Sequence, residues 1–240
     1  MVPLRDVNPV RITPYVTYGL IIANILVFIY EITLPPPVLE SFFRTWAVVP
    51  RDLTMVLEGT GVGSSPFPEW LTLISSQFLH GGFLHIAGNM LFLWIFGNNV
   101  EESLGRIKYL IFYLGCGVLA ALTQWFFASG SDIPSLGASG AIAGVMGAYI
   151  LKYPKAEIVT LIPLGFFSTL ARIPAYFFLG FWFVQQAFNG IVGLNAPADI
   201  GMQGGGIAYW AHAGGFVFGA ILGPLLGLFN DSKEPRTEQL

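Results

Sequence analysis

The chain has 240 residues, of which 54% are hydrophobic and 10% charged, and its mean hydropathy is +0.67. This composition excludes an ordinary soluble domain and predicts a polytopic membrane protein in contact with the lipid bilayer. A formal net charge of −3, without a basic stripe, argues against nucleic-acid binding. The single cysteine, Cys116, lies in an apolar run and excludes a disulfide framework.

Six apolar stretches approach the roughly 20 residues that a helix needs to cross a hydrocarbon core of about 30 Å. They cover residues 15–33, 82–100, 108–128, 138–153, 172–192 and 207–229. The sequence therefore predicts an all-α bundle of six transmembrane helices over residues 15–229. Polar tails, residues 1–14 and 230–240, flank this bundle, and no internal repeat divides it.

The placement of Lys and Arg predicts that both termini are cytoplasmic. In that orientation nine basic residues lie inside and two, Arg44 and Arg51, lie outside. The longest connection, about residues 34–81, is then external, and its mixture of prolines, acids and bulky apolar residues predicts short amphipathic helices at the membrane surface. We expect an integral, multi-pass protein of a prokaryotic cytoplasmic (inner) membrane.

The fourth span is short, and it begins at Ser139 among small residues in PSLGASGAIAGVMGAY. The ten residues before it, SGSDIPSLGA, do not suit a helix, so we expect an extended segment that descends beside a water-filled cavity. A helix that begins at Ser139 offers free N–H groups, and Gly137 leaves space beside them. This pattern suits a nucleophile with an oxyanion hole. Taken alone, Ser139 is better explained as a small residue at a helix contact.

All three histidines lie in or beside predicted spans, where ionisable groups are costly and commonly functional. At about 1.5 Å per residue, Ser139, His85 and His212 lie roughly 20–27 Å above the inner face, in the outer half of the bilayer. Small residues at spacing four predict a close contact between the fourth and sixth spans. These residues are Gly140, Gly144 and Ala148 in the fourth span, and Ala211, Gly215, Gly219 and Gly223 in the sixth.

Such a contact would bring His212 to Ser139 as its general base. No acid on the spans is placed to complete a triad, so the sequence predicts a Ser–His dyad. The alternative for His212 is an ordinary hydrogen bond between helices.

His85 and Asn89 are four residues apart and share a helix face. Both could donate hydrogen bonds, together with the Ser139 backbone N–H, to the oxyanion that forms on attack. Asn89 could instead only bridge helices, and His80 is better explained as an interfacial histidine near water. Because no carboxylate or cysteine completes a metal set, we expect no metal and no other cofactor.

Three motifs carry a resemblance to a known family. HGGFLHIAGNM, GASGAIAGVMG and AHAGGFVFGA, in this order on the expected spans, resemble the rhomboid intramembrane serine proteases over roughly residues 68–228. The resemblance implies a serine endopeptidase that cleaves transmembrane helices of single-span proteins near small residues. It implies that Ser139 is the nucleophile, His212 the base, and His85 and Asn89 the oxyanion donors.

Two positions depart from the family pattern. Leu71 follows Trp70 where many members have Arg, which puts the anchoring of the first loop in doubt. Ala143 stands where several members have an aromatic residue that stacks on the catalytic histidine. A stacking partner is then missing or comes from elsewhere.

Further residues are candidates for a lateral gate or a cap, although a packed helix and an ordinary loop explain them as well. They are Trp182, Gln185 and Gln186 on the fifth span, and Gly204 in GMQGGG. Two other functions stay open. A transporter with a broken fourth helix would be expected to show an inverted repeat, which we do not find. A protein that binds membrane helices without cleaving them would not need both Ser139 and His212. The sequence gives no oligomeric state.

Overall fold

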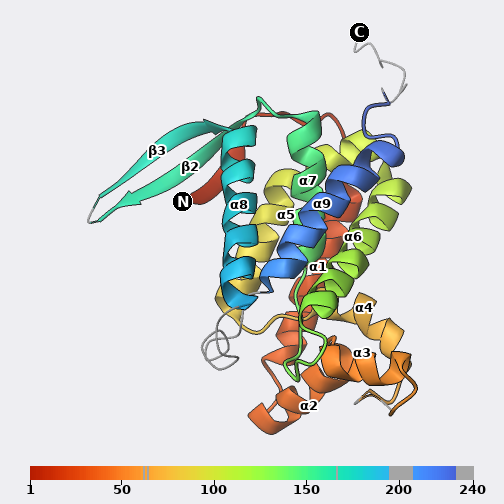
Figure 1. The fold of residues 1–240 in the computed structure, drawn as a ribbon. Coiled ribbons are helices and arrows are strands. Elements are labelled where there is room, and N and C mark those ends of the chain that lie inside the picture. The colour runs from red at the N-terminus through yellow and green to blue at the C-terminus, as the bar shows by residue number, and fades with distance from the viewer. Residues whose placement is uncertain (62, 64, 166, 195–207, 231–240) are drawn as a thin grey trace.

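A computed structural model describes residues 1–61, 63, 65–165, 167–194 and 208–230. Within these residues, six longer helices form a bundle (Figure 1). They are α1 (Tyr15–Glu31), α5 (Phe83–Leu104), α6 (Arg106–Phe127), α7 (Ser139–Lys152), α8 (Ala175–Leu194) and α9 (Tyr209–Leu225). The first residue of each helix lies within three residues of the first residue of a predicted span, which confirms these six segments as helices.

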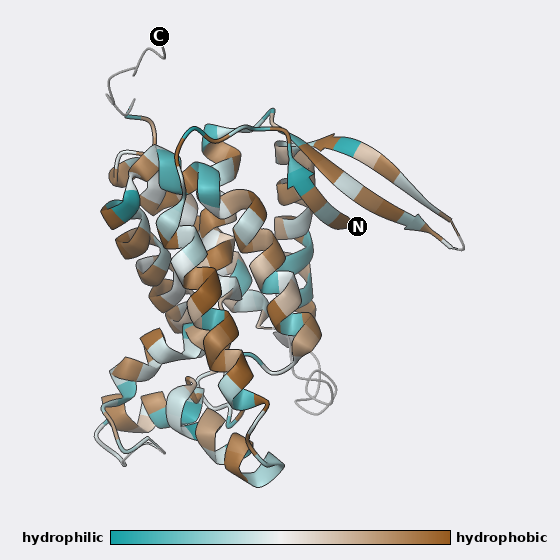
Figure 2. Cartoon of the chain, turned by 180° about the vertical axis from the view of Figure 1, so that it is seen from behind, coloured by the Kyte–Doolittle hydropathy of each residue, from teal (hydrophilic) through white to brown (hydrophobic). Residues whose placement is uncertain are grey.

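The outer surface of the bundle is apolar. Figure 2 shows brown, hydrophobic residues along the length of its helices, and large apolar side chains such as Ile111 and Phe181 are exposed. Such a surface suits contact with lipid. Among the described helices, α6 is long and apolar enough to cross a membrane. α5 is a second candidate if it forms one span with the segment Glu69–Phe78, from which it is bent by 83°. The count of six spans therefore stays a prediction.

A small sheet corrects the expectation of an all-α chain. β2 (Glu157–Leu164) and β3 (Phe167–Pro174) form an antiparallel hairpin between α7 and α8, and β1 (Val2–Asp6) pairs with β2. The hairpin projects sideways from one end of the bundle (Figure 1). Residues 172–174, predicted as the start of the fifth span, belong to β3, and the tail 1–14 contains β1. Hydropathy alone does not distinguish a short apolar strand from the end of a buried helix.

Buried polar contacts hold the N-terminal segment on the bundle. The Glu101 carboxylate of α5 accepts hydrogen bonds from the backbone N–H groups of Val16 (3.0 Å) and Thr17 (2.8 Å), and so caps the start of α1. Asp6 at the end of β1 accepts a hydrogen bond from the Tyr149 hydroxyl of α7 at 2.7 Å. Burial raises the pKa of the Asp6 carboxyl. These contacts hold α1 against α5, and β1 against α7.

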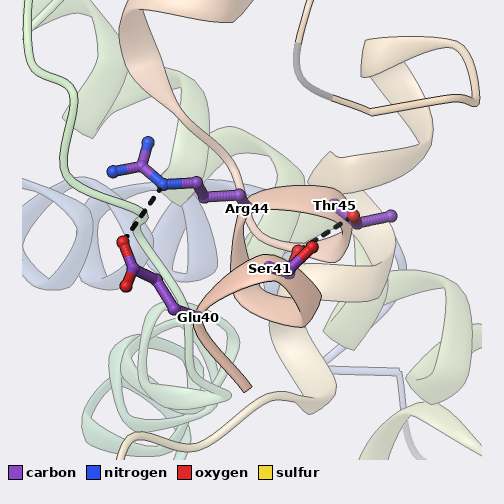
Figure 3. A network of polar contacts seen from close by, with 4 residues as sticks. All are labelled: Glu40, Ser41, Arg44 and Thr45. Carbon is purple, nitrogen blue, oxygen red and sulfur yellow. Dashed lines mark hydrogen bonds and ion pairs between the residues drawn. The ribbon is translucent and has the colours of Figure 1, made fainter. Parts of the chain in front are cut away.

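The long connection between α1 and α5 contains short helices, as predicted. They are α2 (Pro36–Trp46), α3 (Pro50–Leu57) and α4 (Thr72–Ser75), the last between two 3₁₀ turns. Figure 3 shows the polar side of α2, where Arg44 lies 3.6 Å from Glu40 and the Thr45 hydroxyl donates to the Ser41 carbonyl at 2.9 Å. The location of this segment at a membrane surface stays a prediction.

α7 packs against α9 along the predicted ridges of small residues. A Cβ atom on Gly215 would meet the carbonyl oxygen of Gly140, and one on Gly219 would meet the backbone of Gly144. The two helix backbones are therefore in contact, with no room for a side chain between them. This arrangement confirms the predicted contact and brings the first turns of α7 and α9 together.

We expect Gly219→Ala to lower the free energy of unfolding by about 1–3 kcal/mol, because the added methyl group has no space against α7. Thermal unfolding in detergent measures the change. The matched control is Gly115→Ala in the middle of α6, where an added Cβ meets nothing within 4 Å. That variant should be neutral or slightly more stable, since alanine favours a helix over glycine. Equal destabilisation of both variants would contradict the role of the ridge.

Candidate active site

The segment directly before α7 is extended, as predicted, and backbone hydrogen bonds also tie it to the rest of the protein. Ser135 and Val48 exchange backbone hydrogen bonds of 2.7 and 3.1 Å, and the N–H of Gly137 donates to the Ser76 carbonyl at 2.8 Å. These bonds join the chain before Ser139 to two different parts of the long connection. The start of α7 is thus fixed by backbone contacts rather than left to a loop.

Ser139 is the first residue of α7, and His212 lies in the first turn of α9. The Nε2 atom of His212 is 2.7 Å from the Ser139 hydroxyl oxygen. Close by, the side-chain oxygen of Gln124 accepts a hydrogen bond from the N–H of Ala211 at 3.2 Å, which ties the start of α9 to α6. An imidazole nitrogen at this distance is placed to accept the hydroxyl proton.

The other side of the His212 ring contacts α8. Its Nδ1 atom is 2.8 Å from Oε1 of Gln186, and the Trp182 ring lies beside it with centroids 5.6 Å apart and an angle of 36° between the planes. We predicted Trp182 and Gln186 only as gate candidates and missed this contact. The available signal was that Trp182 and Gln186 are four residues apart on one helix, which puts both side chains on the same face.

The same contact answers the question raised by Ala143. Ala143 is fully buried in α7, and the aromatic neighbour of His212 is Trp182 of α8. Of the remaining gate candidates, Gln185 is exposed on α8, and Gly204 lies outside the described residues. A gate role for any of them stays a prediction.

His85 and Asn89 both approach the backbone just before Ser139. Gly137 has φ +122°, and a Cβ added there would lie 2.8 Å from Nε2 of His85 and 3.7 Å from Nδ2 of Asn89. Only glycine combines this backbone angle with this proximity. The N–H of Gly81 donates to Nδ1 of His85 at 3.4 Å, so a neutral His85 carries its hydrogen on Nε2, the atom nearest Gly137.

His80 is buried, with 1% of its surface exposed, and not near water as expected. Its Nε2 atom is 2.9 Å from Nδ2 of Asn89, and its backbone N–H donates to the Glu31 carboxylate at 3.2 and 3.3 Å. His80 therefore helps to orient the Asn89 amide. We did not predict the contact with Glu31. An acid at the end of a span was the one sign of a buried partner in the sequence.

An apolar cavity of about 510 Å³ lies between α6, α8 and α9. Phe126, Phe183 and Trp210 are among its lining residues, whereas Ser139 and His212 are not. The water-filled cavity expected at Ser139 stays a prediction.

A family model described as the Rhomboid domain matches residues 68–229, more than half of the chain. The chain belongs to the rhomboid family. Similar curated proteins include "Rhomboid protein 1, mitochondrial" of Saccharomyces cerevisiae, 31% identical over 157 residues (64% of this chain, 41% of the relative). "Rhomboid-like protein 11, chloroplastic" of Arabidopsis thaliana is 30% identical over 166 residues (68% and 55%). "Rhomboid protease GluP" of Bacillus subtilis is 40% identical over 82 residues (34% and 16%).

Membership of the rhomboid family confirms the resemblance and fits a largely helical membrane bundle. The matches span about half of these relatives' lengths or less. The expectation of a prokaryotic cytoplasmic membrane is wrong, because relatives such as those of yeast and Arabidopsis are named as mitochondrial or chloroplastic. The distribution of basic residues orients helices but does not identify the membrane, so the sequence pattern could not make this distinction.

Proposed function

We propose that this rhomboid is an intramembrane serine endopeptidase that cleaves the transmembrane helices of single-span proteins. The observation that carries the proposal is the 2.7 Å distance between the Ser139 hydroxyl and Nε2 of His212. Membership of a family that includes a protein named as a protease supports it. The proposal includes six spans, with both termini on the side where most Lys and Arg lie.

In the proposed reaction, the Ser139 oxygen attacks the carbonyl carbon of the scissile peptide while its proton passes to Nε2 of His212. The carbonyl oxygen becomes negative and accepts hydrogen bonds from the Ser139 backbone N–H, His85 and Asn89. His212 then gives the proton to the leaving amine, and an ester to Ser139 is left. Water, activated by His212, hydrolyses this ester and restores the enzyme.

The reaction needs water and an exposed peptide carbonyl, and neither is available inside an intact membrane helix. The proposal therefore includes a water-filled cavity around Ser139 in the outer half of the bilayer. It also favours substrate helices with small residues, since these unwind most readily. Glycine-rich substrate segments should accordingly be cut faster than leucine-rich ones of the same length.

The test uses the full chain, purified and reconstituted in liposomes with a model single-span substrate. We expect discrete fragments, covalent labelling of the protein by a fluorophosphonate, and no effect of EDTA, because the base lies directly beside the nucleophile. A transporter or a non-cleaving helix-binding protein would give neither fragments nor labelling. Activity that EDTA abolishes and zinc restores would replace the serine mechanism with a metalloprotease.

A further inference from the structure

We propose that Gln186 is a positioning residue for the general base, so that the site works as a Ser139–His212–Gln186 triad. This inference rests on the proposed protease function. Both nitrogens of the imidazole have a partner: Nε2 lies 2.7 Å from the Ser139 hydroxyl and Nδ1 lies 2.8 Å from the Gln186 amide oxygen. The sequence predicted a dyad, because no acid on the spans is placed to be a third member.

The hydrogen on the imidazole decides whether His212 acts as a base. A neutral imidazole carries one hydrogen, and Nε2 accepts the Ser139 proton only when that hydrogen is on Nδ1. The carbonyl oxygen of Gln186 is an acceptor and has no hydrogen to donate, so its contact selects the Nδ1–H form. During attack the proton moves from Ser139 to Nε2, and the hydrogen on Nδ1 stays in its bond to Gln186.

A neutral third member suits this location. Gln186 is buried, with 8% of its surface exposed, and an ionised carboxylate at such a site would carry a large desolvation cost. The amide provides the same acceptor without a permanent charge. Its bond to Nδ1 becomes stronger when His212 is protonated, because the donor is then an ion. The interaction therefore favours the transition state over the resting enzyme.

Trp182 completes the support of the ring. It lies one helical turn before Gln186 on α8, and its indole is tilted by 36° against the imidazole at 5.6 Å. One helix thus fixes both the hydrogen position and the tilt of the base. In this chain the two contacts on α8 stand in for an aromatic side chain at Ala143.

Two variants at one position test the inference. Gln186→Met keeps the length of the side chain but removes the acceptor, and we expect kcat to fall about 10- to 100-fold with little change in KM. Gln186→Glu keeps the acceptor and should retain most of kcat at alkaline pH. Its carboxylate stabilises the protonated imidazole, so the acid limb of the pH–rate profile should move up by about 1 pH unit or more. Rates of fluorophosphonate labelling should change in parallel with kcat.

The matched control is Gln124→Met. Gln124 also holds α9, through the Ala211 N–H. The described contacts of the His212 ring are instead with Ser139, Gln186 and Trp182. It should leave the pH profile in place, even if thermal stability falls. Three results would overturn the role of Gln186. They are a wild-type kcat in Gln186→Met, an unchanged pH–rate profile in Gln186→Glu, and in Gln124→Met the same shift of the acid limb as in Gln186→Glu. Absence of Ser139-dependent cleavage in the wild type would instead overturn the proposed protease function, and this inference with it.

Discussion

Ser139→Ala and His212→Ala should each reduce the rate of substrate cleavage by on the order of 10⁴-fold or more. Alanine at 139 removes the atom that attacks, and alanine at 212 removes the group 2.7 Å away that takes its proton. Because the two residues act in one step, the double variant should be no slower than either single variant. Fragment yield per hour in liposomes, and fluorophosphonate labelling of the same preparations, measure the effect.

The control is Ser168→Ala on β3, which removes an exposed hydroxyl outside the bundle and should leave cleavage and labelling unchanged. Thermal unfolding of the four variants and the wild type must be similar for the comparison to hold, and we expect this because Ser139 and His212 are only half-buried. Cleavage that persists in Ser139→Ala would remove the nucleophile assignment altogether.

His85→Ala and Asn89→Ala should lower kcat, with KM nearly unchanged. A Cβ added to Gly137, two residues before Ser139, would lie 2.8 Å from Nε2 of His85 and 3.7 Å from Nδ2 of Asn89, so both side chains face the chain beside the proposed nucleophile. Loss of one such donor typically costs about 2.7–4 kcal/mol, or roughly 10²–10³ in rate. The remaining donors partly compensate each single loss, so the double variant should be slower than either. Steady-state kinetics with a soluble-tagged single-span substrate separate kcat from KM.

Asn89 has a competing explanation as a bridge, because its amide contacts His80 at 2.9 Å. If bridging were its whole role, Asn89→Ala would lower thermal stability as much as His80→Ala does, and kcat per folded molecule would stay at the wild-type value. Both quantities are measured on the same preparations. An unchanged kcat removes Asn89 from the proposed oxyanion site.

The helices and the meeting of Ser139 with His212 could be predicted because each depends on a strong local signal. Long apolar segments fold as helices in most contexts, and small residues at spacing four mark surfaces where two backbones can touch, as they do at Gly215 and Gly219. The spacing of small residues therefore predicted both the helix α7 and its contact with α9.

The contacts of α8 had only a weaker signal, the spacing of four between Trp182 and Gln186. Gly180 and Gly193 on this helix have open space where a side chain would be, and Gly190 lies against the Trp210 ring of α9 and not against His212. Which face of α8 meets His212 depends on the rotation of the helix, and a mostly apolar helix does not encode that rotation in its hydropathy. The hydrogen bond from the His80 backbone N–H to Glu31 joins residues that are 49 apart in sequence, and no local pattern predicted it.

The pairing of α7 with α9 also sets an order of events during synthesis. The nucleophile and its base are 73 residues apart, and α9 is the last helix of the described chain. In the proposed six-span protein, Ser139 would therefore leave the ribosome before His212 has been translated. Until α9 docks on the glycines of α7, the nascent protein holds an inert hydroxyl among other newly inserted helices. In the proposed protease, cleavage would therefore begin only after α9 has docked on α7.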